Sequence, residues 1–198
     1  MILVCDTETG GLDPEEHSIL SFAAKHRASG ETFEVFIREP ILRVQADALA
    51  INRIDLREYK EKALGPTEAL SEFYRWVGVM AREHEESDRR TGRVPQIVGV
   101  GHNLVAFDMP MIKRWYRQAG VALTDFRRDW THRVLDTMIY ARCLADAGVI
   151  EPRGFSLEAL CDYFGIYQDP MARHTALGDV EATDDLLTAL HTAAREAR

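Results

Sequence analysis

The order of apolar patterns along the chain constrains its fold more than any other feature. Short apolar runs typical of buried strands come early, at residues 1–6, 19–26 and 32–38, and one more returns at 96–101. Helical spacing of apolar residues predicts helices at 66–81, 107–119, 137–147, 157–164 and 179–194. Strands followed by helices, with one strand returning between them, predict a mixed β-sheet flanked by helices in a single α/β domain over residues 1–198.

The composition agrees with one globular domain and excludes several other classes of protein. Of the 198 residues, 46% are apolar and 28% are charged, which excludes a disordered, collagen-like or coiled-coil chain. The apolar runs are too short for a transmembrane helix, and the acidic N-terminal segment is unlike a signal peptide, so we expect no membrane partner. Three widely separated cysteines, Cys5, Cys143 and Cys161, predict free thiols in a reducing cytoplasm.

The formal net charge of −8 argues against a protein that coats nucleic acid through a basic surface. It does not argue against an enzyme that meets phosphate groups through bound cations. The charged segment 83–95 is expected to form a surface loop. Eight basic residues are expected on the solvated surface unless they flank a site: Arg43, Arg53, Arg57, Lys113, Arg114, Arg117, Arg127 and Arg128.

Four acidic side chains occupy positions where the predicted elements should carry apolar ones. Asp6 and Glu8 continue the side of the first strand that alternation assigns to the core. Asp108 heads the apolar stripe of the helix at 107–119, and Asp179 heads the stripe of the last helix. The helix dipole stabilises an acidic residue in a first turn by about 0.3–1 kcal/mol. Burying an unpaired carboxylate costs several kcal/mol, so these four residues predict a shared neutralising group.

A divalent cation is the simplest neutralising group, because the sequence offers no matching set of inward-facing Lys or Arg residues. Ligands that are all oxygen select Mg²⁺ or Mn²⁺ rather than Zn²⁺. His174 precedes Asp179 by five residues. A lone histidine is usually a surface or core residue, but beside a metal–carboxylate cluster His174 becomes the best candidate for a general base.

Three segments carry these residues and together resemble a known family. DTETGGLD at 6–13, GHNLVAFD at 101–108 and HTALGD at 174–179 resemble the three motifs of the DEDD 3′–5′ exonucleases. The histidine five residues before the last aspartate resembles the histidine-bearing (DEDDh) subgroup. That subgroup includes the proofreading exonuclease subunit of bacterial replicative DNA polymerase, ribonuclease T and oligoribonuclease. The resemblance covers the whole chain in the right order.

The resemblance implies a ribonuclease-H-like fold and a site with two Mg²⁺ or Mn²⁺ ions. By motif match, Asp6 would bridge both ions, and Glu8 and Asp179 would hold the ion that carries the attacking water. Asp108 would serve the second ion, partly through waters, and His174 would take the proton from the attacking water. The implied reaction is metal-dependent hydrolysis of phosphodiester bonds from the 3′ end, with release of nucleoside 5′-monophosphates.

The resemblance also implies residues that bind the 3′ end of the substrate. Thr9 and Gly10 match positions whose backbone meets the terminal nucleotide, and Leu12 matches an apolar wedge against the last base. Asn103 and Phe107 match positions that line the same pocket. For each of these residues, ordinary loop packing is the alternative explanation.

Residues 50–54 depart from the family pattern that they otherwise resemble. The family loop often has histidine and glycine where this chain has Asn52 and Arg53. We expect Asn52 to take part in substrate binding, but the departure leaves the fit around the penultimate base open.

Several functions are compatible with these motifs. We expect a standalone exonuclease that prefers single-stranded DNA ends, in repair or proofreading, with RNA trimming as the alternative. A proofreading subunit that works with a polymerase usually carries a partner-binding tail beyond the last helix. Here only residues 194–198 follow the apolar stripe of the last predicted helix, which favours the standalone enzyme. An idle binding module or a structural ion site would have no use for the five intact catalytic positions. The oligomeric state stays open, although several relatives are homodimers.

Overall fold

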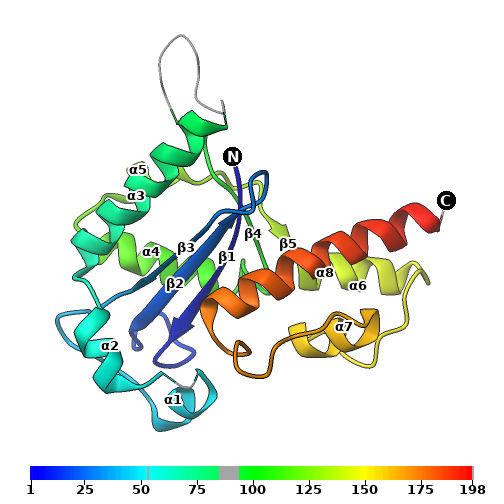
Figure 1. The fold of residues 1–198 in the computed structure, drawn as a ribbon, viewed down its shortest axis with the longest axis horizontal. Coiled ribbons are helices and arrows are strands. Elements are labelled where there is room, and N and C mark those ends of the chain that lie inside the picture. The colour runs from blue at the N-terminus through cyan, green and yellow to red at the C-terminus, as the bar shows by residue number, and fades with distance from the viewer. Residues whose placement is uncertain (53, 85–93, 198) are drawn as a thin grey trace.

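A mixed β-sheet forms the centre of the computed structural model, which describes residues 1–52, 54–84 and 94–197 (Figure 1). Its strands in this part of the chain are β1 Ile2–Thr9, β2 Ile19–His26, β3 Thr32–Phe36, β4 Val98–Gly101 and β5 Leu135–Asp136. Their order across the sheet is β3-β2-β1-β4-β5. β2 is antiparallel to both β1 and β3, whereas β4 is parallel to both β1 and β5. The expected mixed sheet is confirmed.

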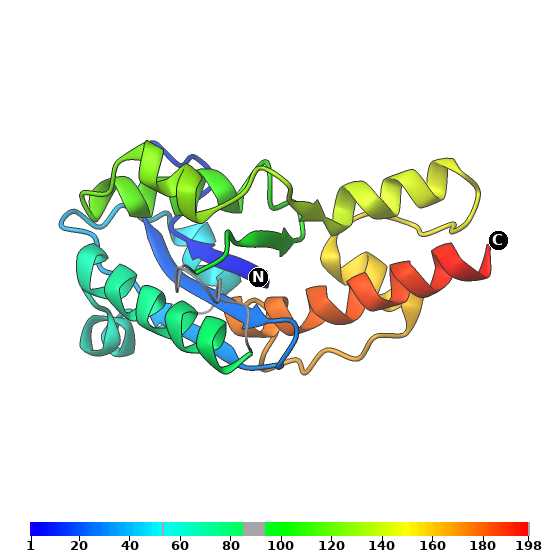
Figure 2. The same cartoon turned by 90° about the horizontal axis from the view of Figure 1, so that it is seen from above.

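Helices cover both faces of this sheet. They are α1 Ala46–Asn52, α2 Leu56–Lys62, α3 Pro66–Glu83, α4 Asp108–Gln118, α5 Leu123–Asp129, α6 Thr137–Asp146, α7 Leu157–Phe164 and α8 Ala176–Glu196. α3, α4 and α5 share one apolar cluster with Leu3 of β1. α8 packs on the opposite face, where Val180 and Leu187 cluster with Val4. α6 and α7 lie beside α8, away from α3 (Figures 1 and 2).

Alternation along β1 decides which side chains reach each face of the sheet. Thr7 points to the face covered by α3 and α4, whereas Asp6 and Glu8 point to the face covered by α8. Across the antiparallel ladder, Asp6 lies opposite Ala23 and Glu8 lies opposite Ser21 of β2. Because these neighbours are small, they leave space beside both carboxyl groups.

The predicted elements are present, with shifted ends. β1 continues to Thr9, which places Glu8 on the strand, and β3 ends at Phe36. The last helix begins earlier than expected because the Thr175 hydroxyl accepts a hydrogen bond from the Gly178 N–H and caps it. Asp179 therefore lies in the first turn of α8. Most of the charged segment expected as a surface loop, residues 85–93, lies outside the described residues.

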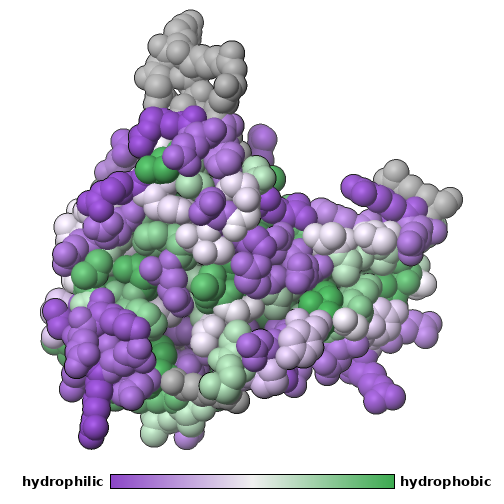
Figure 3. All heavy atoms as spheres, viewed as in Figure 1, coloured by the Kyte–Doolittle hydropathy of each residue, from purple (hydrophilic) through white to green (hydrophobic). Residues whose placement is uncertain are grey.

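The sequence did not predict α1, α2, α5 or the two-residue strand β5. α2 buries only Tyr59 and is otherwise rich in charged residues, so it carries no clear apolar stripe. Figure 3 shows the hydrophilic surface over α2. Within the described ranges, no helix combines the length and the apolar character that a membrane span needs.

Candidate active site

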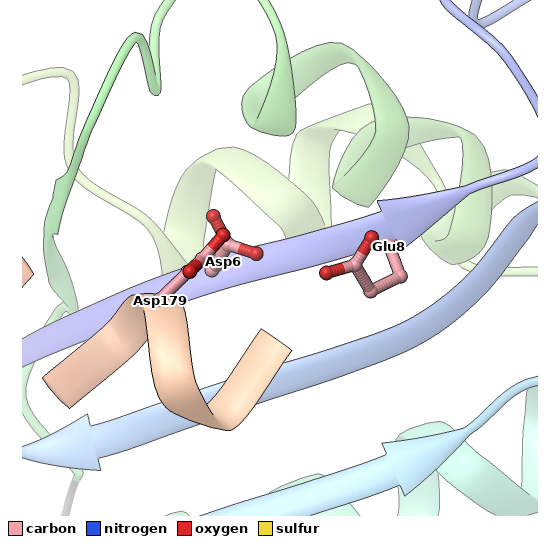
Figure 4. A group of neighbouring side chains, drawn as sticks. All are labelled: Asp6, Glu8 and Asp179. Carbon is pink, nitrogen blue, oxygen red and sulfur yellow. The ribbon is translucent and has the colours of Figure 1, made fainter. Parts of the chain in front are cut away.

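Three of the four predicted carboxylates converge on one face of the sheet. Asp6 and Glu8 project from β1, and Asp179 projects toward them from the first turn of α8 (Figure 4). One carboxylate oxygen from each residue lies within 4.8 Å of one oxygen from each of the other two. The alternation of β1 and the stripe of α8 produce this geometry, because both direct their acidic positions into the same layer.

Asp108 lies outside this group of three and approaches β1 from another direction. It is the first residue of α4 and is only 2% exposed. Its Oδ1 accepts hydrogen bonds from the Thr7 backbone N–H at 2.9 Å and from the Thr7 hydroxyl at 2.7 Å. The ladder between β1 and β4 ends at Val4, so Asp108 takes the place of a further strand partner for Thr7. One of its two carboxylate oxygens is thus committed to the protein.

The four carboxyl groups all have raised pKa values. Burial raises the pKa of Asp6 well above its ordinary range, and the charges of Asp108, Glu8 and Asp179 raise it further. Burial, followed by the charges of Asp179 and Asp108, raises the pKa of Glu8 to about 9. Burial also raises the pKa of Asp108 to about 7 and raises that of Asp179. Three converging carboxyl groups that are hard to ionise together fit a hard divalent cation, for which they supply oxygen ligands.

His174 lines the same cleft as Asp6, Glu8 and Asp179, and its backbone adopts an unusual conformation. Its φ of 59° is left-handed, which is strained by about 1–3 kcal/mol for a residue other than glycine. Thr175 fixes the turn around it, because both the N–H and the hydroxyl of Thr175 donate to the Ala172 carbonyl. A Cβ on Gly178 would lie 2.0 Å from that carbonyl oxygen, so only glycine allows this turn to meet α8. The backbone therefore fixes where the imidazole can lie.

A cleft of about 430 Å³ is lined by Asp6, Glu8, Asp179 and His174, whereas the buried Asp108 is not among its lining residues. Its size is in the range of small-ligand sites, roughly 300–1,000 Å³. Apolar side chains stand at its rim: Leu12 is 81% exposed and Ile51 is 60% exposed. The described residues that line it are Asp6, Thr7, Glu8, Thr9, Gly11, Leu12, Gln45, Asp47, Ala48, Ile51, Asn52, Phe107, His174 and Asp179.

Four of the six expected substrate-binding residues line this cleft: Thr9, Leu12, Asn52 and Phe107. The Thr9 hydroxyl donates to the Gly11 carbonyl, and the Asn52 side-chain amide donates to the Thr9 carbonyl at 3.1 Å. Asn52 thereby ties the end of α1 to the end of β1. Arg53, the other departure from the family loop, lies outside the described residues.

Gly10 and Asn103 are not among the described residues that line the cleft. The Gly10 N–H donates to the Ser18 carbonyl, and its own carbonyl accepts from the Gln45 N–H. Asn103 has a left-handed φ of 60°, and its N–H donates to Oδ1 of Asp136. Both residues therefore make backbone hydrogen bonds to neighbouring segments instead of lining the cleft.

Sequence reasoning missed Thr7 and the wall of the cleft that α1 supplies. Alternation could have found Thr7, because it points away from Asp6 and Glu8 toward the helix that begins with Asp108. Gln45, Asp47 and Ala48 gave no such signal, since the only buried residue of α1 is Asn52. Ile51 lies in the segment 50–54 that the resemblance indicated, although its place in the cleft was not predicted.

No family model matches the sequence, and no curated protein matches it either. Structures of E. coli exonuclease I are similar to this chain. The complex with a dT13 oligonucleotide has a TM-score of 0.76 at 21% identity, over 99% of this chain and 42% of that one. The zinc-ion-bound complex with single-stranded DNA has a TM-score of 0.76 at 22% identity, and the match covers 100% of this chain and 41% of that one. A product-bound structure has a TM-score of 0.75 at 20% identity, and the match covers 96% of this chain and 43% of that one.

This likeness confirms the expected ribonuclease-H-like fold. The chain spans about two fifths of the length of the exonuclease I chains that it matches. The histidine-bearing subgroup stays a prediction, as do the catalytic roles that the motifs imply.

Proposed function

We propose that residues 1–198 form a single metal-dependent 3′–5′ exonuclease domain that releases nucleoside 5′-monophosphates. The convergence of Asp6, Glu8 and Asp179 in one cleft with His174 carries this proposal. The fold supports it, because E. coli exonuclease I structures of the same fold hold single-stranded DNA oligonucleotides. Single-stranded DNA is therefore the proposed substrate.

The carboxylates are the proposed ligands for two Mg²⁺ or Mn²⁺ ions. In this assignment Asp6 would bind both ions, Glu8 and Asp179 would bind one of them, and Asp108 would bind the other, partly through water. Oδ1 of Asp108 is engaged by Thr7, which leaves its second oxygen for this role. When bound, two such ions stabilise the attacking and leaving oxygens of an in-line displacement at phosphorus.

His174 is the proposed general base. It lines the cleft with Asp6, Glu8 and Asp179, where it can accept the proton of an attacking water. An imidazole suits this role because it takes up a proton near neutral pH. The strained turn at His174 and the close approach of Gly178 hold the ring near the carboxylates.

The apolar rim of the cleft is the proposed binding site for the 3′ end of the substrate. Leu12, Ile51 and Phe107 offer apolar surface to nucleobases, and such contacts tolerate any base sequence. The proposed enzyme therefore shortens single strands with little sequence preference. Thr9 and Asn52 would hold the terminal nucleotide beside the carboxylates.

The test is a digestion panel of 5′-labelled single-stranded DNA, duplex DNA and short RNA, with Mg²⁺ or Mn²⁺. We expect a ladder that shortens stepwise from the 3′-hydroxyl end and disappears in EDTA. Asp6→Asn should be inactive, whereas Asp13→Asn, outside the carboxylate group, serves as the matched control. Internal cleavage of a circular single strand as the main activity would contradict the proposal.

The same panel separates the alternative functions. Faster digestion of RNA than of DNA would favour an exoribonuclease, and activity that appears only with a polymerase would favour a proofreading subunit. Repair or proofreading of DNA in the cytoplasm is the preferred role. The free thiols of Cys5, Cys143 and Cys161 support a reducing compartment.

A further inference from the structure

A buried ion pair joins Arg114 of α4 to Glu39, outside the carboxylate site. The guanidinium Nε and Nη2 donate to Glu39 Oε1 at 3.0 Å and Oε2 at 2.9 Å. Their side chains are only 9% and 1% exposed. The expectation of a solvated Arg114 is wrong. Arg114 follows Met111 by one helical turn and so shares the buried side of α4.

The rest of the guanidinium holds the loop at residues 10–18. Nη1 donates to the backbone carbonyls of Pro14 at 3.0 Å and Glu15 at 3.1 Å. This loop carries Leu12 into the cleft. Arg114 therefore fixes the backbone of the loop from behind the apolar rim.

Glu39 extends the same network toward α1. Its Oε2 accepts from the Ser18 hydroxyl at 2.8 Å, and its Oε1 accepts from the Ile19 N–H at 3.2 Å. The Ser18 hydroxyl in turn accepts from the Arg43 N–H at 2.9 Å. Burial alone would raise the pKa of Glu39, but hydrogen bonds from Arg114 and Ser18 lower it, so the carboxylate stays ionised. The segment that leads into α1 is thus tied to the same pair.

We propose that Arg114 is a positioning residue that sets the distance between Leu12 and Ile51, the two apolar side chains at the rim of the cleft. This inference rests on the proposed function and deepens it. The loop at 10–18 carries Leu12, and α1 carries Ile51. Arg114 binds the loop directly and reaches the segment before α1 through Glu39 and the Ser18 hydroxyl. The carboxylates project instead from β1 and α8. Loosening Arg114 should weaken the hold on the strand and spare the chemistry at the carboxylates.

An arginine is needed because its planar fork serves four acceptors at once: two carboxylate oxygens and two carbonyls. Arg114→Lys keeps the charge but cannot reproduce the fork. Arg117→Lys is the matched control. Arg117 lies on the same helix and forms an ion pair with Glu15 of the same loop. In this pair the Arg117 side chain is 61% exposed and the Glu15 side chain is 72% exposed. Surface pairs of this kind contribute little.

The experiment compares two substrates in steady-state kinetics with Mg²⁺ or Mn²⁺. One is a single-stranded oligo(dT), and the other is bis(p-nitrophenyl) phosphate, a phosphodiester without bases. We expect Arg114→Lys to raise KM for oligo(dT) about tenfold, equivalent to about 1.4 kcal/mol of binding free energy, with kcat within about twofold. Hydrolysis of the base-free ester should stay within about twofold of wild type. Arg117→Lys should match wild type on both substrates.

Equal losses on both substrates would overturn this role, because Arg114 would then support the site as a whole. A KM for oligo(dT) equal to that of Arg117→Lys would overturn it as well. Ser18→Ala, measured in parallel, removes the hydroxyl between Glu39 and Arg43 and keeps the test decisive if Arg114→Lys fails to fold. It should raise KM for oligo(dT) about threefold, and an unchanged KM would contradict the proposal. Wild-type protein that hydrolyses neither substrate would overturn the proposed function itself.

Discussion

The crowded carboxyl groups predict that the metal-free protein is destabilised by its own site, and Glu8 gives the clearest measure. Its pKa rises from 4.5 to about 9 on folding. Between these two values the folded protein binds a proton that the unfolded chain has lost, so the free energy of unfolding falls as pH rises. At pH 7 this difference is at most about 3.4 kcal/mol, taking about 1.36 kcal/mol for each pH unit above 4.5.

Glu8→Gln replaces the ionisable carboxyl group by a neutral amide of nearly the same shape. In EDTA at pH 7 we expect the variant to be more stable than wild type by about 1–3 kcal/mol. For a chain of this size, 1 kcal/mol corresponds to about 2–4 °C in Tm. The gain should be small near pH 5 and should grow up to pH 9, because only the wild-type protein loses the contribution of Glu8 in that window. The measurement is a set of thermal melting curves from pH 5 to pH 9.

The control and the refutation use the same curves. Glu31→Gln, at an exposed position before β3, should follow wild type across the whole range. Mg²⁺ at a thousand times Kd should reverse the ranking, because it stabilises wild type by about 4.1 kcal/mol and only the intact carboxylates gain this full binding energy. If Glu8→Gln and wild type run parallel in EDTA from pH 5 to pH 9, Glu8 is not under strain and the reasoning fails.

Three further variants test the surroundings of the site. His174→Ala should lower kcat by about 10²–10⁴-fold, and near-normal turnover would exclude it as the base. Gly178→Ala should lower the free energy of unfolding by about 1–3 kcal/mol through its backbone clash, whereas Gly78→Ala in α3 should raise it by about 0.5–1 kcal/mol. Urea unfolding measures both. Thr7→Val removes a donor to Asp108 and should cost about 1.5–3 kcal/mol, while Thr7→Ser should stay near wild type.

The sequence predicted the part of the site that regular elements build. Asp6 and Glu8 share a face because a strand alternates, and Asp179 shares the buried stripe of its helix. Asp108 also lies on a buried stripe, as expected. Its separate approach could not be predicted, because the position of a helix terminus relative to the sheet depends on packing between α4 and the rest of the core.

The cleft wall and the buried ion pair depend on contacts that no local pattern reveals. α1 is a short helix whose only buried residue is Asn52, so it lacks the apolar period that marks a helix. Arg114 is buried only because Glu39 meets it from a position 75 residues away in the chain. A charged residue without a visible partner is ordinarily exposed, which is why the sequence pointed to the surface.

The apolar rim and the carboxylates belong to different kinds of structure. Asp6 and Glu8 sit on the central strand of the sheet, whereas Leu12 lies in a loop and Ile51 on a short helix, both attached from outside. Mutations in the rim can therefore accumulate without disturbing the sheet. Under the proposed function, changes at the rim would alter which strand ends are accepted and leave the carboxylates unchanged. An exchange of residues 10–18 and 40–52 would have to keep Glu39 and Arg114, because this buried ion pair holds both segments.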